Sequence, residues 1–197
     1  MAIVSRGFAS RRREPDQRVP PGQYVTDDFP VLSAGPTPRI DTDRWSFELV
    51  SEHGERATWT WSELLALPID KVETDIHCVT RWSKLATRWR GVSLDHLLAG
   101  VETSALYATV DCYGGYTTNL PLADLRGGKA WIAYEFDGRQ LRPEHGGPAR
   151  LLIPHLYFWK SAKWVRGLHL QVRDEPGFWE RNGYSMHGDP WTEDRYS

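Results

Sequence analysis

Residues 74–94 read TDIHCVTRWSKLATRWRGVSL and set a cysteine between an apolar, strand-like run and a strongly basic segment. The basic residues of this segment are Arg81, Lys84, Arg88 and Arg90. Neighbouring positive charges lower the pKa of a thiol and favour the thiolate, which is both a nucleophile and a soft metal ligand. Cys78 is therefore a candidate for either role, although a free cysteine on a strand is more often a small buried core residue.

A thiol nucleophile normally needs a histidine partner. A regular strand would turn His77 to the face opposite Cys78, and the other histidines are distant in sequence and lack the context of a cysteine protease. No zinc-type spacing of Cys and His surrounds residue 78. Cys78 and Cys112 are the two cysteines of the chain, which is too few for a secreted disulfide scaffold. Two free thiols and a single disulfide both remain open.

Composition indicates an aromatic-rich globular protein. The 197 residues include ten Trp and thirteen Pro and carry a formal net charge of -2. This balance provides no global positive field for nucleic acid or anionic lipid, and no apolar run reaches the length of a membrane span. The basic cluster Arg11–Arg13 is not followed by the apolar stretch of a twin-arginine signal. The sequence therefore predicts a cytoplasmic protein.

Short strand-like runs separated by turn residues dominate the chain from residue 45 onward. Capping residues predict short helices that begin after Thr60, where Glu63 completes a capping box and Pro68 stops the helix, and after Ser93. The segment that follows Cys78 is expected to be a basic loop. Strands are expected over 45–50, 56–61, 71–78, 130–136, 149–158 and 164–173, with two more within 105–122 and a helical turn over 122–128. The pattern predicts an α+β fold with mixed or antiparallel sheets and short helices, as a single domain over 25–197 after a basic, Pro-rich arm over 1–24.

A second set of candidate residues follows the glycine pair Gly146–Gly147. The sequence EHGGPARLLIP, residues 144–154, is followed by KSAKWVRG, residues 160–167. A glycine loop allows the backbone to approach a ligand closely, and arginine and lysine side chains bind phosphate. These segments predict either a hairpin with solvated charges or an anion cradle, with the candidates His145, Arg150, Lys160, Lys163 and Arg166.

The tryptophans form a third set. Most are expected in the core, but a stacked aromatic platform would also suit a carbohydrate or a flat heterocycle. The C-terminal segment 174–197 is aromatic as well, so it is expected to cover a surface rather than to be a solvated linker. These features keep a cofactor-free anion- or carbohydrate-binding module as the alternative function. The tryptophans concerned are Trp82, Trp89, Trp159, Trp164 and Trp179.

The three sets, in this order and spacing, resemble the sulfite-oxidase family of molybdopterin-dependent oxidoreductases. DIHCVTRWSKLATRWRGVSLDHLL (75–98) is similar to the segment that carries the cysteine ligand of molybdenum. HGGPARLLIP (145–154) and KSAKWVRGLHL (160–170) resemble the segments that hold the pterin and its phosphate. GFWERNGYSMHGDPW (177–191) is similar to the segment with the active-site tyrosine, which falls on Tyr184. The likeness runs from about residue 25 to the end of the sequence.

The resemblance implies a sulfite-oxidase fold and a Mo-molybdopterin cofactor in its plain pterin form. It makes Cys78 the molybdenum ligand and names Cys78, Arg81 and Tyr184 as catalytic residues, with Arg88 and Arg90 among the arginines that neutralise the cofactor or attract an oxyanion. His187 is a further candidate beside Tyr184. The segment 29–39, FPVLSAGPTPR, is expected to lie over the pterin. The implied pterin contacts are Cys78, Cys112, His145, Arg150, Ser161, Ala162 and Lys163.

The implied reaction is oxygen-atom transfer to or from a small oxyanion or an S- or N-oxide, with a two-electron change at the metal. Electrons would be exchanged with a separate carrier, a haem or flavin protein, because 197 residues leave no room for the haem and dimerisation domains of vertebrate sulfite oxidases. The pair of arginines that follows the cysteine in the family is not reproduced here. Sulfite itself is therefore a doubtful substrate, and methionine-sulfoxide repair in a periplasm is disfavoured by the expected cytoplasmic location.

Overall fold

Two β-sheets contain most of the regular secondary structure in the computed structural model, which describes residues 17–197. The basic cluster Arg11–Arg13 lies outside the described residues. Sheet A has six strands: β1 (Tyr24–Val25), β4 (Asp70–His77), β5 (Trp82–Ser93), β8 (Trp131–Phe136), β9 (Arg139–Gln140) and β10 (Arg150–Leu152). Sheet B has five strands: β2 (Ser46–Val50), β3 (Arg56–Thr60), β6 (Tyr107–Cys112), β7 (Thr117–Pro121) and β11 (Val165–Gln171).

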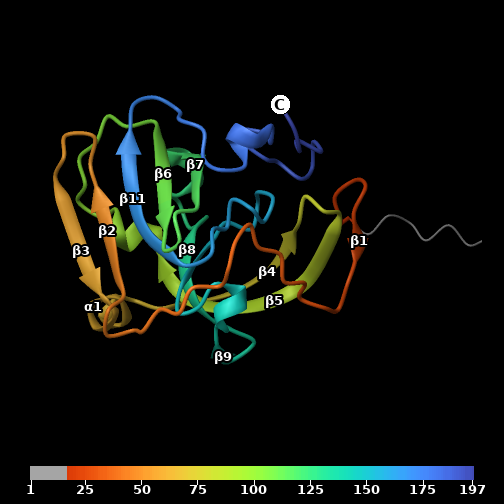
Figure 1. The fold of residues 1–197 in the computed structure, drawn as a ribbon, viewed down its shortest axis with the longest axis horizontal. Coiled ribbons are helices and arrows are strands. Elements are labelled where there is room, and N and C mark those ends of the chain that lie inside the picture. The colour runs from red at the N-terminus through yellow and green to blue at the C-terminus, as the bar shows by residue number, and fades with distance from the viewer. Residues whose placement is uncertain (1–16) are drawn as a thin grey trace, which may run out of the picture.

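Both sheets are mixed, as predicted. Their pairings are antiparallel except that β1 runs parallel to β5 and β11 runs parallel to β2. The strand order of sheet B is β3-β2-β11-β6-β7. Figure 1 shows sheet B on the left, β4 and β5 of sheet A at the lower right, and the C-terminal segment above them. The prediction of mixed sheets with few, short helices in one domain is confirmed.

The helices are short and begin at the predicted caps. α1 (Trp61–Ala66) has the capping box of Thr60 and Glu63, in which the Thr60 hydroxyl accepts from the Glu63 amide and the Glu63 carboxylate accepts from the Thr60 amide. α2 (Leu94–Leu97) begins after Ser93, whose hydroxyl accepts from the Asp95 amide. It ends at Leu97. The 3-10 turns are η1 (Leu122–Asp124), η2 (Pro143–His145) and η3 (Glu180–Asn182).

The cap of α1 allows a stability prediction. Thr60→Ala removes an acceptor for an otherwise unpaired amide, and we expect a loss of about 1 kcal/mol in the free energy of unfolding. For a chain of this size that loss lowers Tm by roughly 2–4 °C. Thermal unfolding followed by circular dichroism measures the change, and Thr58→Ala, at an exposed position of β3, is the matched control. Equal changes in the two variants would contradict the role of the cap.

The predicted basic loop after Cys78 is wrong in extent, because most of it is strand. The turn covers only residues 78–81, and β5 then runs from Trp82 to Ser93, paired with β4 and β8. Trp89 is buried in the sheet, whereas Arg88 and Arg90 on either side of it point to the opposite face. Arg88 pairs with Asp137 at 3.0 Å and Arg90 with Glu135 at 3.0 Å. These two arginines therefore neutralise neighbouring carboxylates of sheet A.

The strand predicted over 149–158 is also shorter than expected. β10 ends at Leu152, and Pro154, which has no amide hydrogen to donate to a ladder, follows where the chain turns away from the sheet. Beyond it the Tyr157 amide donates to the Gly188 carbonyl and the Phe158 amide donates to the His77 carbonyl. The turn thus brings residues 157–164 beside both the Cys78 segment and the C-terminal segment.

The segment between β1 and β2 crosses from sheet A to sheet B (Figure 1). Its anchor is Phe29, which packs against the rings of Trp82, Trp89 and Phe158 and stacks on His145 with 4.0 Å between ring centroids. No helix among residues 17–197 is long and apolar enough to cross a membrane. The crossing segment covers the site described next.

Candidate functional site

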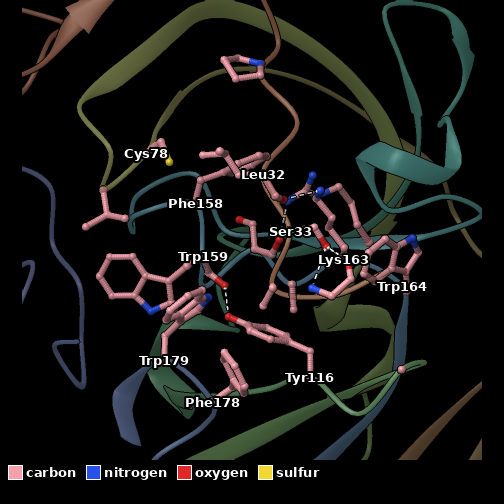
Figure 2. Close-up of a pocket in the computed structure, with 18 of the residues that line it drawn as sticks. Leu32, Ser33, Cys78, Tyr116, Phe158, Trp159, Lys163, Trp164, Phe178 and Trp179 are labelled. Carbon is pink, nitrogen blue, oxygen red and sulfur yellow. Dashed lines mark hydrogen bonds between the residues drawn. The ribbon is translucent and has the colours of Figure 1, made fainter. Parts of the chain in front are cut away.

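A cavity of about 540 Å³ lies where the two sheets, the crossing segment and the C-terminal segment meet. Its walls come from residues within the segments 29–38, 78–82, 113–116, 158–164 and 178–184, so segments far apart in the sequence build it together. Figure 2 shows Cys78 and Lys163 on opposite sides of Leu32 and Ser33, with Trp159, Trp179 and Phe178 along a third side. The predicted docking of segment 29–39 over this site agrees with the placement of residues 29–38.

Cys78 lies at the wall of this cavity, in the turn between β4 and β5. Its side chain is 7% exposed, and the Thr80 hydroxyl donates to its Sγ at 3.2 Å. The turn is held from both sides, because Gln23 Nε2 donates to the Cys78 carbonyl at 3.1 Å and Arg195 Nη1 donates to the Val79 carbonyl at 2.6 Å. The thiol therefore has a fixed position and an open path to the cavity.

The electrostatics of Cys78 differ from the expectation. Burial is the main influence and raises the pKa of the thiol, while the Thr80 hydrogen bonds and the charge of Arg195 act in the opposite direction. The expected lowering of its pKa by the neighbouring basic residues is therefore wrong, because Arg88 and Arg90 are paired with carboxylates along β5. A buried neutral thiol of this kind becomes a thiolate when a metal cation displaces its proton.

His77 lies on the other face, as predicted. Its Nδ1 shares a hydrogen bond of 2.8 Å with the Ser83 hydroxyl, and its ring meets Trp191 edge-on. His77 does not line the cavity. The two cysteines are free, and no group of three or more His, Cys, Asp or Glu side chains within residues 17–197 could hold a metal ion. Cys78 therefore stands as a single soft ligand.

Two cations stand at the opposite wall. Arg150 is 1% exposed and donates to the carbonyls of His145 and Ser161, and its guanidinium lies 4.0 Å from the centroid of the Phe158 ring. Lys163 Nζ donates to the carbonyls of Leu32 at 2.7 Å and Glu144 at 2.6 Å. Neither side chain forms an ion pair with a carboxylate in the described part of the chain. Burial lowers the pKa of Arg150 to about 9 and that of Lys163 to about 8. This wall is thus built to receive an anion.

The other predicted pterin contacts surround these cations. Ser161 and Ala162 line the cavity, and the Ser161 hydroxyl accepts from the Ile153 amide at 2.8 Å. His145 lies behind Phe29, with its Nδ1 buried and without a hydrogen-bond partner within residues 17–197. Burial, followed by the charges of Arg142 and Arg150, lowers the pKa of His145 to about 4. The neutral imidazole therefore keeps an unused Nδ1, but it lies behind Phe29 and outside the lining of the cavity.

The depressed pKa of His145 predicts acid sensitivity. The imidazole of the unfolded chain takes up a proton near pH 6.5, whereas His145 in the folded protein does so only near pH 4. The free energy of unfolding is therefore highest above pH 6.5 and falls as the pH is lowered from 6.5 to 4. Between pH 7 and pH 4.5 the wild-type protein loses free energy of unfolding, and we expect His145→Asn to make this loss smaller by roughly 1–3 kcal/mol. Urea unfolding across the pH range measures it. His53→Asn, at an exposed histidine, is the control and should not change the slope, whereas equal slopes in all three proteins would refute the assignment.

Aromatic rings form the third wall, in which Tyr184 lies beside two tryptophans. Its ring meets Trp159 edge-on at 5.3 Å and Trp179 at 4.9 Å. Burial raises the pKa of Tyr184, so its hydroxyl remains a hydrogen-bond donor at neutral pH. Trp82 and Trp164 also line the cavity, whereas Trp89 packs beneath it. The tryptophans expected mostly in the core therefore include four that face the site.

Several other predicted residues, like His145, do not line the cavity. Arg81 is exposed and lies in the Cys78 turn with a φ of 78°. Cys112 is buried in the core at the end of β6, directly before the lining residues 113–116. His187 Nε2 hydrogen-bonds the Asp124 carboxylate at 3.1 Å. The roles assigned to them by resemblance stay predictions.

Sequence reasoning missed several residues of the site. Tyr116 donates from its hydroxyl to the Trp159 carbonyl at 2.9 Å, and the positive-φ pair Gly114–Gly115 that precedes it is the signal that could have drawn attention to this loop. Phe178 was visible only as part of an aromatic segment. Gln23 and Arg195 hold the Cys78 turn through long-range hydrogen bonds that no local pattern indicates.

Comparison with known proteins identifies one family of oxidoreductases. Residues 34–179 match the family model of the oxidoreductase molybdopterin binding domain. An uncharacterized oxidoreductase of Bacillus subtilis, YuiH, is 43% identical over 96% of this chain and 98% of its own length. A putative protein-methionine-sulfoxide reductase subunit of Azospira oryzae, YedZ1, is 27% identical over 89% of this chain and 69% of its own.

More distant relatives are larger proteins. Human mitochondrial sulfite oxidase is 23% identical over 87% of this chain, which corresponds to 38% of the human protein. The crystal structure of the sulfane dehydrogenase SoxCD from Paracoccus pantotrophus superposes with a TM-score of 0.62 at 19% identity, over 70% of this chain and 41% of that one. This superposition agrees with the sulfite-oxidase-like fold expected from the sequence.

Proposed function

Since the chain belongs to the family of oxidoreductase molybdopterin-binding domains, we propose that it transfers an oxygen atom to or from a small, uncharged S- or N-oxide. The family implies a Mo-molybdopterin cofactor and oxidoreductase activity. The observation that carries the proposal is the cavity itself, in which a soft thiol faces the two cations Arg150 and Lys163 and an aromatic wall. A cofactor-free binding module would need neither the thiol nor its fixed turn.

The residues present fit the cofactor. Cys78 supplies a thiol ligand at one wall, and a thiolate is a ligand that soft metal centres prefer. Arg150, which is buried, and Lys163, which is half-buried, have no carboxylate partner among residues 17–197 and would hold the phosphate at the other wall. Ser161 and Ala162 line the same cavity and would complete the contacts. His145 lies behind Phe29, outside the lining, with a buried Nδ1 that has no hydrogen-bond partner within residues 17–197. When bound, the cofactor supplies the two-electron chemistry.

The charge of the cavity supports an uncharged substrate. Arg150 and Lys163 are the only charged side chains among the described residues that line it. Once these cations hold the cofactor phosphate, no lining cation remains to pair with a dianion such as sulfite. The space between Cys78 and the aromatic wall is instead enclosed by rings, which favour contacts with methyl or aryl groups. This argument prefers a neutral oxide over the oxyanions that the sequence also allowed.

The residues of the wall have defined tasks in this reaction. An oxide that loses its oxygen takes up two electrons and two protons and releases water, and the reverse reaction returns them. Tyr184, whose raised pKa keeps its hydroxyl protonated, would donate a hydrogen bond to the oxygen of the substrate. Trp159 and Trp179 would orient the apolar substituents and exclude water. The segment 29–38 closes the cavity on the opposite side.

The electrons are proposed to be exchanged with a separate haem or flavin carrier in the cytoplasm. The relative from Azospira oryzae is called a subunit, which supports a partner protein. Cell fractionation tests the location. Reduction or oxidation of carriers by the loaded enzyme and substrate tests the partner, and turnover sustained without any added carrier would contradict the proposal.

A substrate screen tests the reaction. The protein is purified from a host that makes the molybdenum cofactor and is reduced with a viologen dye. We expect reoxidation by dimethyl sulfoxide and trimethylamine N-oxide, and a kcat/KM for sulfite oxidation at least about tenfold lower than that for the better oxide. Sulfite as the best substrate would overturn the preference for neutral oxides. Protein free of molybdenum, or inert toward all substrates, would overturn the oxidoreductase proposal.

A further inference from the structure

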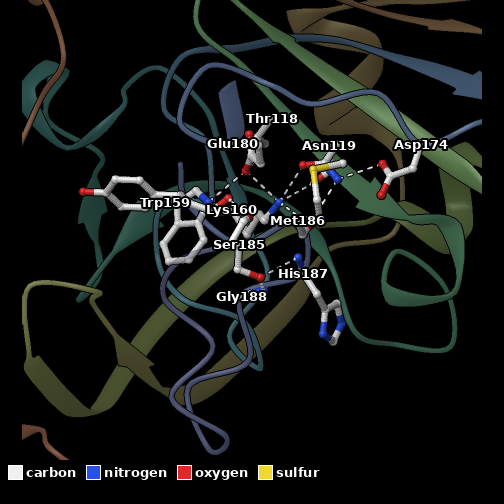
Figure 3. A network of polar contacts seen from close by, with 12 residues as sticks. Thr118, Asn119, Trp159, Lys160, Asp174, Glu180, Ser185, Met186, His187 and Gly188 are labelled. Atoms are coloured by element: carbon white, nitrogen blue, oxygen red, sulfur yellow. Dashed lines mark hydrogen bonds and ion pairs between the residues drawn. The ribbon is translucent and has the colours of Figure 1, made fainter. Parts of the chain in front are cut away.

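A buried ion pair lies directly behind the aromatic wall (Figure 3). Lys160 Nζ stands 2.7 Å from Glu180 Oε1, and both side chains are 0% exposed. Lys160 sits in sequence between the lining residues Trp159 and Ser161, and Glu180 follows Trp179. Neither Lys160 nor Glu180 lines the cavity. The pair therefore joins, from behind, the two segments that form the wall.

The ammonium group of Lys160 is fully engaged. It donates to the Asn119 carbonyl at 2.9 Å, to Asn119 Oδ1 at 2.7 Å and to the Met186 carbonyl at 2.8 Å. The Asn119 amide in turn donates to Asp174 at 2.8 Å and to Met186 at 3.0 Å. One lysine thus ties the middle of β7 to the C-terminal segment on both sides of Tyr184. Burial lowers its pKa and the charge of Glu180 raises it.

The carboxylate of Glu180 holds the indole of Trp159. Trp159 Nε1 donates to Glu180 Oε1 at 2.9 Å, and the Thr118 hydroxyl donates to the same oxygen at 3.1 Å. The indole held in this way meets the ring of Tyr184 edge-on at 5.3 Å and 82°. The orientation of two lining rings therefore depends on one carboxylate that no substrate can touch.

Burying the pair costs free energy that an apolar pair of similar size would not cost. Desolvation of two ions offsets their attraction, so well-packed hydrophobic replacements are often equally stable. The directional bonds of a lysine and a carboxylate do fix geometry, which apolar side chains cannot do. A stabilising role alone would explain why side chains pack at these two positions, but not why the two side chains are charged.

We propose that Lys160 and Glu180 are positioning residues that set the distance and angle between Trp159 and Tyr184 and so decide which oxides fit opposite Cys78. The proposal rests on the proposed function, because the rings act on the substrate of that reaction. Loss of the pair allows the rings to rotate. Substrate selectivity then changes while the walls at Cys78, Arg150 and Lys163 keep the cofactor.

Two charge-neutral double variants separate positioning from burial. Lys160→Met with Glu180→Gln keeps an acceptor for the Trp159 indole, whereas Lys160→Met with Glu180→Met removes it. We expect the ratio of kcat/KM for methyl phenyl sulfoxide over dimethyl sulfoxide to change by less than about threefold in the first and about tenfold or more in the second. The change should lie mainly in KM, with the molybdenum content of both at the wild-type level.

Thr118→Val is a milder variant that protects the test against misfolding. It removes one hydrogen bond to Glu180 without altering a lining residue, and we expect a change of about twofold to fivefold in the same ratio. The exposed pair Arg56–Glu48 of sheet B provides the control, as Arg56→Met with Glu48→Gln, which should leave the ratio unchanged. Wild-type selectivity in both the Met–Met double variant and Thr118→Val would overturn the proposal, as would loss of molybdenum in step with selectivity.

Amide hydrogen exchange provides a readout that needs neither cofactor nor substrate. In the protein without molybdenum, residues 178–184 should exchange faster in the Met–Met double variant than in the Met–Gln double variant, while residues 78–82 exchange equally in both. Equal protection of 178–184 in the two variants would refute the positioning role. If the wild-type protein reduced no oxide but the exchange difference appeared, the proposed function would fail while the mechanical role of the pair would stand.

Discussion

Replacing Cys78 by serine is expected to abolish activity. A hydroxyl is a much weaker ligand than a thiolate for a soft metal, and the described residues offer no second thiol at the cavity. We expect the molybdenum content of the purified protein to fall at least about tenfold and kcat/KM to fall by about a thousandfold or more. Elemental analysis and the viologen assay measure the two effects.

The loss has to be separated from misfolding and from covalent thiol catalysis. Serine is similar in size to cysteine, so we expect Tm of the metal-free protein to change by less than about 4 °C. In the wild-type protein, bound molybdenum should protect Cys78 from alkylation by iodoacetamide. A Cys78→Ser protein that retained both metal and turnover would contradict the ligand role, and full activity without molybdenum that alkylation destroyed would instead support a thiol enzyme.

Removing the cations of the opposite wall is expected to have the second largest effect. Lys163→Met loses the ammonium that bridges Leu32 and Glu144, so both the charge for a phosphate and the tie to segment 29–38 disappear. We expect cofactor occupancy to fall about tenfold or more. Arg150→Lys keeps the charge but loses the fork that reaches the His145 and Ser161 carbonyls, and it should show a smaller loss.

The matched control for this wall lies on the next strand. Arg166 is exposed, its guanidinium 5.7 Å from the centroid of the Tyr113 ring, and it does not line the cavity. Arg166→Met should therefore keep wild-type occupancy, measured as pterin released by acid and counted by fluorescence after oxidation. A wild-type amount of pterin in Lys163→Met, or an equal loss of pterin in Arg166→Met, would show that this wall does not bind the cofactor.

Local patterns predicted the elements and singled out Cys78, whereas pairings between distant residues decided the charges around its thiol. The cap at Thr60 and the strand that ends before Cys78 depend on neighbours in sequence, and both were confirmed. The sequence predicts that the arginines after Cys78 lower the pKa of its thiol. Strand pairing instead places Arg88 and Arg90 against Asp137 and Glu135, which are about 45–50 residues away in the chain.

Contacts between residues far apart in sequence also limit how much of the site the sequence predicts. The glycine loop and the basic residues that follow it identified the anion wall, because that wall comes from one continuous stretch. The turn at Cys78 is held instead by Gln23 and Arg195, which are 55 residues before it and 116 residues after Val79. The Lys160–Glu180 pair is likewise visible only after the C-terminal segment has packed against the wall.

The fluorescence of the tryptophans around the cavity can report the binding of the cofactor. Trp82, Trp159, Trp164 and Trp179 all line the space in which the pterin is proposed to bind, and a pterin absorbs light in the range in which indoles emit. Energy transfer over such short distances would quench their emission as the cofactor enters. Loading could then be followed in real time in the unlabelled protein, and stopped-flow mixing would give its rate constant.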